Sequence, residues 1–254
     1  MDLDVTSLGS GPPLVFLHGE DGLLFNRPLL DRLAERFTVL APAHPGWGGS
    51  PRPPAVTTID DIAYLYLDFL AALASPVTVV GVSVGAWIAA EAATMNTTNI
   101  AALVLAAPVG IKLGGREDRA FVDLYAVSQA EIAHALYGDT SRAKDLKSLD
   151  DDGFLELAKA EEAVARYVWQ PYMHNPKLPH RLHRIDVPTL VVGGDADRFV
   201  LEDGYVNAWA ELIGDNASAV TIGGAGHRLD EEAPDELARL VHEFASTPLT
   251  TRGA

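Results

Sequence analysis

The stretch Val77-Thr-Val-Val-Gly-Val-Ser83-Val-Gly-Ala-Trp-Ile-Ala-Ala90 decides how this chain folds. Its first four residues are β-branched and favour a strand. Residues from Ala86 onward are small or favour a helix, so the chain must turn sharply between Gly81 and Gly85. A serine at the apex of such a turn has a strained backbone and a hydroxyl that points outward. The pattern therefore predicts a strand, a tight elbow and a helix, with Ser83 placed as a nucleophile.

Two features of the elbow support chemistry at Ser83. A side chain at Gly81 or Gly85 would collide with the neighbouring strand and helix, so both positions need glycine. The helix that follows directs its positive N-terminal end and its free N–H groups at the space beside the hydroxyl. We expect an oxyanion to form in that space.

The composition is that of an ordinary globular chain. Its 254 residues, 48% of them hydrophobic and 21% charged, are enough for one large α/β domain or two small ones. The chain has no cysteine, which excludes disulfides, thiolate metal sites and a cysteine nucleophile. Its formal net charge of −16 argues against binding to nucleic acid or anionic membranes.

The same survey predicts where the protein works and what it meets. There is no apolar run of 18 residues, and residues 1–5 lack the basic and apolar pattern of a signal peptide. We therefore expect a cytoplasmic protein that acts on a small molecule, with no cofactor, no nucleic-acid partner and no membrane partner. The oligomeric state stays open.

Apolar runs and helical spacing alternate along most of the chain. Strands are predicted at 13–18, 37–41, 77–80, 101–106, 187–192 and 217–222, and helices at 23–36, 58–73, 201–213 and 234–244, besides the one after Ser83. Uniformly apolar strands separated by single helices are typical of a parallel sheet that is covered on both faces. The fold class is therefore α/β, with a mostly parallel central sheet.

One segment interrupts this alternation. Residues 110–185 are charged and helix-biased, with helices predicted at 118–137, 140–149 and 151–169. A helical insertion between two strands usually lies over the carboxyl edge of the sheet, where α/β proteins bind ligands. We therefore predict a core of residues 1–109 and 186–246, a helical lid of residues 110–185, and a frayed tail at 247–254.

A base and an acid for Ser83 lie farther along the chain. Asp195 and Asp197 follow one predicted strand, and His227 follows the next. Because the carboxyl ends of parallel strands meet at one edge of a sheet, these side chains can meet Ser83 there. The chain order serine, aspartate, histidine is the order of the α/β-hydrolase triad.

With these residues the chain resembles the α/β-hydrolase superfamily, from about residue 11 to residue 244. It is most similar to the lidded single-domain group that includes small esterases and meta-cleavage-product hydrolases. The segments that carry the resemblance are Leu17-His18-Gly19, the Pro45-Gly-Trp-Gly-Gly-Ser50 loop, the elbow, Gly194-Asp-Ala-Asp197-Arg-Phe-Val200 and Gly226-His227.

The resemblance implies a role for each of these residues. Ser83 would be the nucleophile, His227 the general base and then acid, and Asp197 the orienting carboxylate. Asp195 is the alternative acid, but two side chains so close on one loop point differently, so only one can reach His227. The oxyanion hole would use the backbone N–H groups of Glu20 and Val84.

The remaining candidates near the site have less specific signals. The Glu20 carboxylate is expected to point to solvent; facing the pocket, it would repel anionic acyl groups. His18 is expected beneath the oxyanion turn and His44 as a hydrogen-bonding residue of its loop. Four aromatic residues of the lid are candidates either to line an apolar acyl pocket or to form lid core: Phe121, Tyr125, Trp169 and Tyr172. Three histidines lack the spacing and acidic partners of a metal site: His174, His180 and His183.

The serine at the elbow narrows the reaction. Haloalkane dehalogenases and epoxide hydrolases of this fold have aspartate there, so the resemblance implies acyl-enzyme chemistry on a carboxylic ester. The first alternative is a carbon–carbon hydrolase, whose members usually have asparagine before the serine, where this chain has Val82. The second alternative is a hydrolase-fold ligand receptor without turnover.

Overall fold

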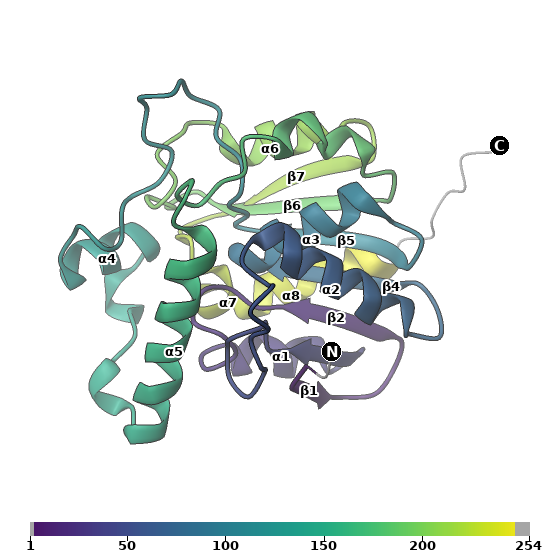
Figure 1. Cartoon of the computed structure of the whole chain (residues 1–254), viewed down its shortest axis with the longest axis horizontal. Helices are drawn as coiled ribbons and strands as arrows, with labels where there is room; N and C mark the ends of the chain where they lie inside the picture. The colour runs from purple at the N-terminus through teal and green to yellow at the C-terminus, as the bar shows by residue number, and fades with distance from the viewer. Residues whose placement is uncertain (1–2, 247–254) are drawn as a thin grey trace.

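A seven-stranded sheet forms the centre of the molecule (Figure 1). The structure is a computed structural model and describes residues 3–246, so the predicted frayed tail at 247–254 lies outside the described residues. The strands run in the order β1-β3-β2-β4-β5-β6-β7, and β1 alone is antiparallel to its neighbour. The strands are β1 (Val5–Leu8), β2 (Pro13–Leu17), β3 (Thr38–Pro42), β4 (Val77–Val82), β5 (Ile100–Ala106), β6 (Thr189–Gly194) and β7 (Ala217–Ile222). The predicted α/β fold with a mostly parallel sheet is confirmed.

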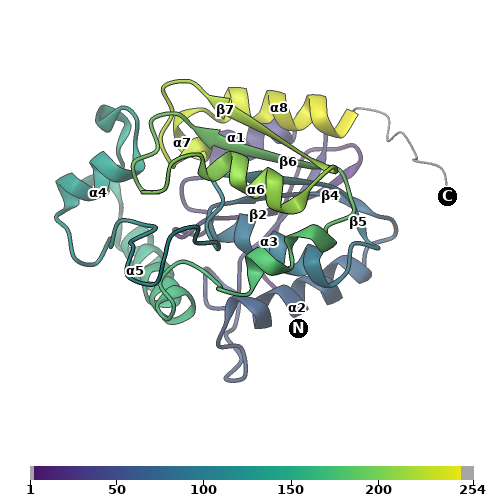
Figure 2. The same cartoon turned by 90° about the horizontal axis from the view of Figure 1, so that it is seen from above.

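Helices cover both faces of the sheet (Figure 2). One face packs against α1 and α8, and the other packs against α2, α3 and α6. The helices are α1 (Arg27–Leu33), α2 (Ile59–Ala71), α3 (Val84–Met95), α4 (Gln129–Leu136), α5 (Asp151–Val168), α6 (Tyr205–Ile213), α7 (Leu229–Glu232) and α8 (Pro234–Ser246).

Helix α3 differs from the other helices because it is buried on all sides. Every residue from Val84 to Thr94 is buried, and most of them are alanine or another apolar residue. A helix that is apolar all round belongs inside a protein, because no face of it is suited to water. The elbow at Ser83 is therefore held between two fully buried elements, since β4 is buried along its whole length as well.

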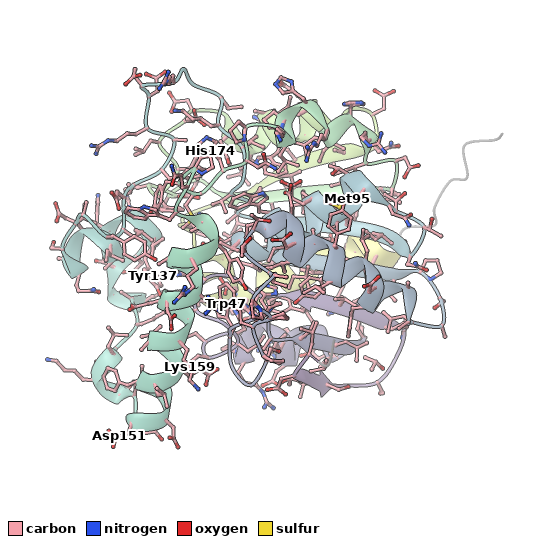
Figure 3. All side chains as sticks on the ribbon, viewed as in Figure 1. Trp47, Met95, Tyr137, Asp151, Lys159 and His174 are labelled. Carbon is pink, nitrogen blue, oxygen red and sulfur yellow. The ribbon has the colours of Figure 1, made fainter. Side chains whose placement is uncertain are left out.

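Segment 110–185 lies with α4 and α5 beyond one end of the sheet, at the left of Figures 1 and 2, and its last residues pack on α3 and α6. It contains α4, α5 and four short 3-10 helices, η1 (Thr140–Arg142), η2 (Leu146–Ser148), η3 (Leu178–His180) and η4 (Leu182–Arg184). Helix α5 packs on the loop after β3, where the rings of Trp47 and Tyr167 stack with their centroids 5.6 Å apart. Figure 3 shows Trp47 between α5 and the sheet.

The helix predicted at 118–137 is wrong over its first half. Only α4 is helical, because Ser128 and Glu131 form a capping box that starts the helix at Gln129. The Ser128 hydroxyl accepts from the Glu131 amide, and the Glu131 carboxylate accepts from the Ser128 amide.

The helix predicted at 140–149 is also wrong, and two predicted helices are too long. Asp139 and Asp145 each accept an amide N–H two residues ahead, which gives the short turns η1 and η2 instead of one helix. Helix α1 begins at Arg27 rather than at residue 23, with proline in its first turn. Helix α6 begins at Tyr205 rather than at 201, after Gly204 at φ 69°.

The buried carboxylate of Glu91 joins α3 to the last part of segment 110–185. The Glu91 side chain is fully buried, and its Oε1 accepts hydrogen bonds from Trp87 Nε1 at 3.1 Å and Asn175 Nδ2 at 2.7 Å. Its Oε2 has no hydrogen-bond partner in residues 3–246; the nearest cation is Arg181, at 3.9 Å. Burial, together with the charge of Asp60, raises the pKa of Glu91 to about 7.

This raised pKa predicts how stability depends on pH. The folded chain binds the proton of Glu91 more tightly than the unfolded chain, so stability is full below the unfolded pKa and is lost as pH rises through 7. Replacing Glu91→Gln removes that loss, so the variant gains about 2 to 3 kcal/mol over the wild type between pH 5 and pH 8. Denaturant unfolding at both pH values measures the difference, and a gap that stays constant with pH contradicts the assignment.

Candidate active site

The backbone at Ser83 is strained, as the sequence predicts. Its φ of 50° and ψ of −113° lie where side-chain-bearing residues are rare. The two flanking glycines allow the close packing that produces this strain. A Cβ on Gly81 would lie 2.5 Å from the Gly85 oxygen, and a Cβ on Gly85 would lie 2.1 Å from the Leu17 oxygen in β2.

Three side chains that are far apart in sequence meet at the carboxyl edge of the sheet. Ser83 Oγ lies 2.7 Å from His227 Nε2, and His227 Nδ1 lies 2.8 Å from Asp197 Oδ2. Ser83 and His227 are each 1% exposed, so water is excluded from their contact. The other oxygen of Asp197 accepts the amide N–H groups of Phe199 and Val200, which hold the carboxylate in place.

The structure distinguishes the two candidate acids. Asp197 contacts His227, whereas Asp195 is exposed and accepts the amide N–H of Gly224 at 2.6 Å. Both contacts come from one loop after β6, and the two side chains point in different directions, as expected for residues two positions apart.

Buried aromatic side chains hold the turn after β2 in place. His18 Nδ1 donates to the Gly19 carbonyl at 2.7 Å, and His18 Nε2 accepts the amide N–H of His44 at 3.0 Å. His44 Nε2 donates to the His18 carbonyl at 2.9 Å, and its Nδ1 accepts the Tyr66 hydroxyl at 2.5 Å. Burial lowers the pKa of His18 to about 4 and that of His44 well below its ordinary value, so both rings are neutral.

The two predicted oxyanion donors lie at this turn and at the start of α3. Within residues 3–246 the amide N–H groups of Glu20 and Val84 have no hydrogen-bond partner. Trp47 Nε1 donates to the Glu20 carbonyl at 2.7 Å and so fixes the peptide next to one of them. Two free donors beside a serine hydroxyl match what an oxyanion requires.

The prediction for the Glu20 side chain is wrong. Its carboxylate does not point to solvent, because Oε1 accepts the Ser83 hydroxyl at 2.5 Å and Oε2 accepts Arg228 Nη1 at 3.2 Å. Glu20 is only 7% exposed. The physical reason is the buried cation at Arg228, which makes the interior the favourable place for this carboxylate.

Arg228 is the centre of a buried charge cluster, whose members are Glu20, Asp21, Lys144, Arg228 and Glu231. Arg228 Nη2 lies 2.8 Å from Asp21, and Lys144 bonds to Asp21 and lies 3.2 Å from Glu231. Burial opposes the charge of Arg228, but Asp21, Glu20 and Glu231 outweigh it and raise its pKa. Burial likewise opposes the charge of Asp21, yet Arg228 and Lys144 lower its pKa to about 2.

Segment 110–185 also contributes to the position of His227. The Leu136 carbonyl accepts the amide N–H groups of both His227 and Arg228, at 2.8 and 3.1 Å. The Glu232 carboxylate accepts the amides of Gly138 and Gly226, one from each side of that contact. The loop that carries His227 is therefore held by backbone contacts with the end of α4.

A cavity of about 500 Å³ lies between α4, α5 and the charge cluster. Glu20 and Arg228 line it, together with Tyr125 and Lys144. Its apolar lining residues are Leu124, Ile132, Ala133, Leu136, Ala143, Leu146, Leu157, Val164 and Met173. The volume suits a small organic molecule.

Of the four aromatic residues considered for this pocket, only Tyr125 lines the cavity formed by the described residues. Phe121 is buried against Phe199 and Tyr205, because the chain before α4 folds back onto the core. Trp169 is 53% exposed and packs edge-on against Tyr125 and Tyr172.

The described residues also bear on metals and membranes. Among residues 3–246, no three His, Asp or Glu side chains come together closely enough to hold a metal ion. His174 Nδ1 lies 2.9 Å from the Tyr172 carbonyl, and His180 and His183 are exposed. In the same range, every helix is too short or too polar to cross a bilayer.

Sequence reasoning missed Arg228, Lys144 and the orientation of Glu20. Arg228 had a usable signal, because a charged residue directly after His227 must lie near the hydroxyl. Lys144 had none, since its contact with Asp21 joins positions 123 residues apart.

Known proteins resemble this chain over nearly its full length. The model of the "Alpha/beta hydrolase family" matches residues 14–240. A pimeloyl-[acyl-carrier protein] methyl ester esterase of Xanthomonas campestris pv. campestris is 28% identical, over 97% of this chain and 99% of the relative. A 2-hydroxy-6-oxo-6-(2'-aminophenyl)hexa-2,4-dienoic acid hydrolase of Metapseudomonas resinovorans is 25% identical, over 94% of this chain and 85% of the relative.

Solved structures agree on the fold. A bacterial membrane phospholipase A superposes with a TM-score of 0.74 at 24% identity, covering 96% of this chain and 84% of that one. The family match covers residues of β2 to β7, the elbow and the loops that carry Asp197 and His227. This chain therefore belongs to the alpha/beta hydrolase family.

Proposed function

We propose that this chain is a serine hydrolase that cleaves a carboxylic ester of a small, largely apolar substrate. The observation that carries the proposal is the hydrogen-bonded series Ser83–His227–Asp197, with separations of 2.7 and 2.8 Å, beside two free amide donors. A serine hydroxyl is a weak nucleophile unless a positioned base removes its proton, and this arrangement supplies that base.

The proposed reaction has two halves. Ser83 Oγ attacks the ester carbonyl while His227 Nε2 takes the hydroxyl proton, and the ionised Asp197 stabilises the imidazolium. The tetrahedral oxyanion is bound by the amide N–H groups of Glu20 and Val84. His227 then protonates the departing alcohol, leaving an acyl group on Ser83. Water, deprotonated by the same imidazole, releases the acid and restores the hydroxyl.

The substrate class follows from the cavity. Most of its wall surface is apolar, although charged side chains line one part of it, so the cavity favours an apolar acyl or alcohol group over a polar one. The carboxylate of Glu20 lies next to Ser83 and disfavours a substrate with a negative charge near the scissile bond. In this proposal segment 110–185 acts as a lid, and its helices α4 and α5 form the outer wall of the cavity.

The relative from Metapseudomonas resinovorans, a dienoic acid hydrolase by name, favours carbon–carbon bond hydrolysis as a second candidate. Two observations weigh against it: Val82 stands where such enzymes usually have asparagine, and Glu20 opposes an anionic substrate.

A series of p-nitrophenyl esters of increasing chain length, assayed beside a dienol-diketone, tests both candidate functions. We expect the esters to be hydrolysed; turnover of the dienol-diketone alone reverses the assignment. Ligand binding without turnover, and no burst of one equivalent of p-nitrophenol, favours a receptor.

Removing the nucleophile or the base tests the mechanism. We expect Ser83→Ala and His227→Ala each to lower kcat for a p-nitrophenyl ester by about a thousandfold or more, because each removes a group that acts in the transition state. Thermal unfolding should change little. A wild-type rate in Ser83→Ala overturns the mechanism.

The two aspartates of the β6 loop provide a matched control. Asp197→Asn should lower kcat by about 10³ to 10⁴, because the amide no longer holds the imidazole in the required tautomer. Asp195→Asn removes the same charge two residues away and should have a much smaller effect. Equal losses in the two variants contradict the role given to Asp197.

Removing the Tyr66 hydroxyl tests how the turn after β2, which carries Glu20, is held in place. In Tyr66→Phe the buried His44 Nδ1 loses its donor, which should lower the free energy of unfolding by about 1 to 3 kcal/mol. The loosened turn should also lower kcat/KM, by less than about tenfold. Tyr64→Phe is the control, because Tyr64 is on the same helix but is 61% exposed. Equal unfolding curves for both variants contradict this role.

A further inference from the structure

The cavity and the nucleophile are separated by one side chain. Ser83 and His227 are almost fully buried, and neither is among the residues that line the cavity. Glu20 does line the cavity, and its carboxylate bonds to the Ser83 hydroxyl from that side. A molecule in the cavity, whose outer wall α4 and α5 form at the left of Figure 1, therefore meets Glu20 before it meets Ser83.

The two hydrogen bonds of Ser83 Oγ, with His227 and with Glu20, limit which of these groups can carry a proton. The contact with Asp197 requires a proton on His227 Nδ1. If His227 is neutral, its Nε2 accepts a hydrogen bond from the Ser83 hydroxyl. The contact between Ser83 Oγ and the Glu20 oxygen 2.5 Å away then has a hydrogen only if Glu20 is protonated. If Glu20 is ionised, the hydroxyl donates to Glu20, and Nε2 must carry a second proton.

The neighbouring cation favours the second of these arrangements. Arg228 Nη1 lies 3.2 Å from the other oxygen of Glu20 and stabilises its negative charge. His227 is then doubly protonated and cannot act as a base. An ionised carboxylate in contact with Ser83 Oγ also repels the oxyanion that forms beside it during the reaction.

We propose that Glu20 is a gating and positioning residue: in this closed arrangement its carboxylate accepts the Ser83 hydroxyl hydrogen, which then does not point at His227, and its side chain separates Ser83 from the cavity. This inference rests on the proposed serine hydrolase function. For reaction, the Glu20 carboxylate rotates away from Ser83 while its backbone N–H stays in the oxyanion hole. Opening releases the hydroxyl to His227 and connects the cavity to Ser83.

The charge cluster provides a place for the displaced carboxylate. Arg228 is already bonded to Glu20, and Lys144, which also lines the cavity, is joined to Arg228 through Asp21. Rotation about the Glu20 side chain can therefore keep one cationic partner while the bond to Ser83 breaks.

Several charged and titratable groups face Glu20, and each contributes to the pH at which the gate opens. Ser83 contacts it from the elbow, His227 lies next to Ser83 on the loop after β7, Arg228 pairs with Glu20, and Glu161 of α5 lines the same cavity. The charge of Glu20 is also felt at His18 beneath the turn and at Tyr125 across the cavity. The remaining groups around it are Asp21, Lys144, Tyr172 and Glu231.

Sulfonylation of Ser83 by phenylmethylsulfonyl fluoride tests the gate without requiring ester turnover. In this reaction the Oγ–S bond forms, the S–F bond breaks, and fluoride leaves with the hydroxyl proton. We expect Glu20→Gln and Glu20→Ala to be labelled about tenfold faster than wild type at pH 6, with the acid limb of the rate profile at lower pH. The glutamine amide can donate to Oγ and leave the hydroxyl proton to a neutral His227.

Asp195→Asn is the matched control, because it removes a carboxylate charge from the same edge of the sheet, where Asp195 is exposed and bonds to Gly224 rather than to Ser83 or Arg228. It should leave the labelling rate within about twofold of wild type and the shape of the pH profile unchanged. Circular dichroism verifies that each variant is folded, and Glu20→Gln retains the size of the side chain if Glu20→Ala does not fold.

The outcomes separate the gate from the proposed function. Labelling no faster in Glu20→Gln than in wild type, or an equal rise in Asp195→Asn, overturns the gate. Faster labelling in a protein that hydrolyses no ester supports the gate and overturns the ester hydrolase assignment. Absence of label at Ser83 in wild type and in both Glu20 variants, with Ser83→Ala as the blank, overturns both.

Discussion

The close approach of α3 to the end of β2 is the constraint on which the site depends. Gly85 lies so near the Leu17 carbonyl that no side chain fits between them, and this contact brings the helix N-terminus against the turn that follows β2. The backbone of Ser83 absorbs the sharp change of direction at φ 50°. One packing contact therefore accounts for the strained serine, for the free amide of Val84, and for the position of Glu20 beside the hydroxyl.

The position of His227 depends on a different part of the chain. Its loop is held by the Leu136 carbonyl and by Glu232, so the end of α4 fixes the proposed base as well as one wall of the cavity. Segment 110–185 is thus attached to the core at the loop that carries His227. Any movement that admits a substrate is easier to reconcile with α5 or with the chain before α4, which lack such contacts with the His227 loop in the described residues.

Features that depend on local residue patterns were predicted from the sequence. The orientation of Glu20, which depends on a charge far away in the chain, was not. The sheet and the elbow at Ser83 follow from periodicity, glycine sterics and the shared edge of parallel strands, whereas the choice of Asp197 over Asp195 came from the family resemblance. The helix at 118–137 failed because one capping box outweighs weak helical periodicity. Glu20 was misplaced because its environment is set by Arg228, 208 residues away, and no local pattern contains that information.

The charges around Arg228 explain how a carboxylate can lie against the serine hydroxyl at all. Arg228 and Lys144 carry two positive charges, and Asp21 and Glu231 balance them without Glu20. The charge of Glu20 is therefore the surplus one in the cluster. In the proposed gate, the pairing with Arg228 keeps Glu20 in the cluster while its bond to Ser83 breaks.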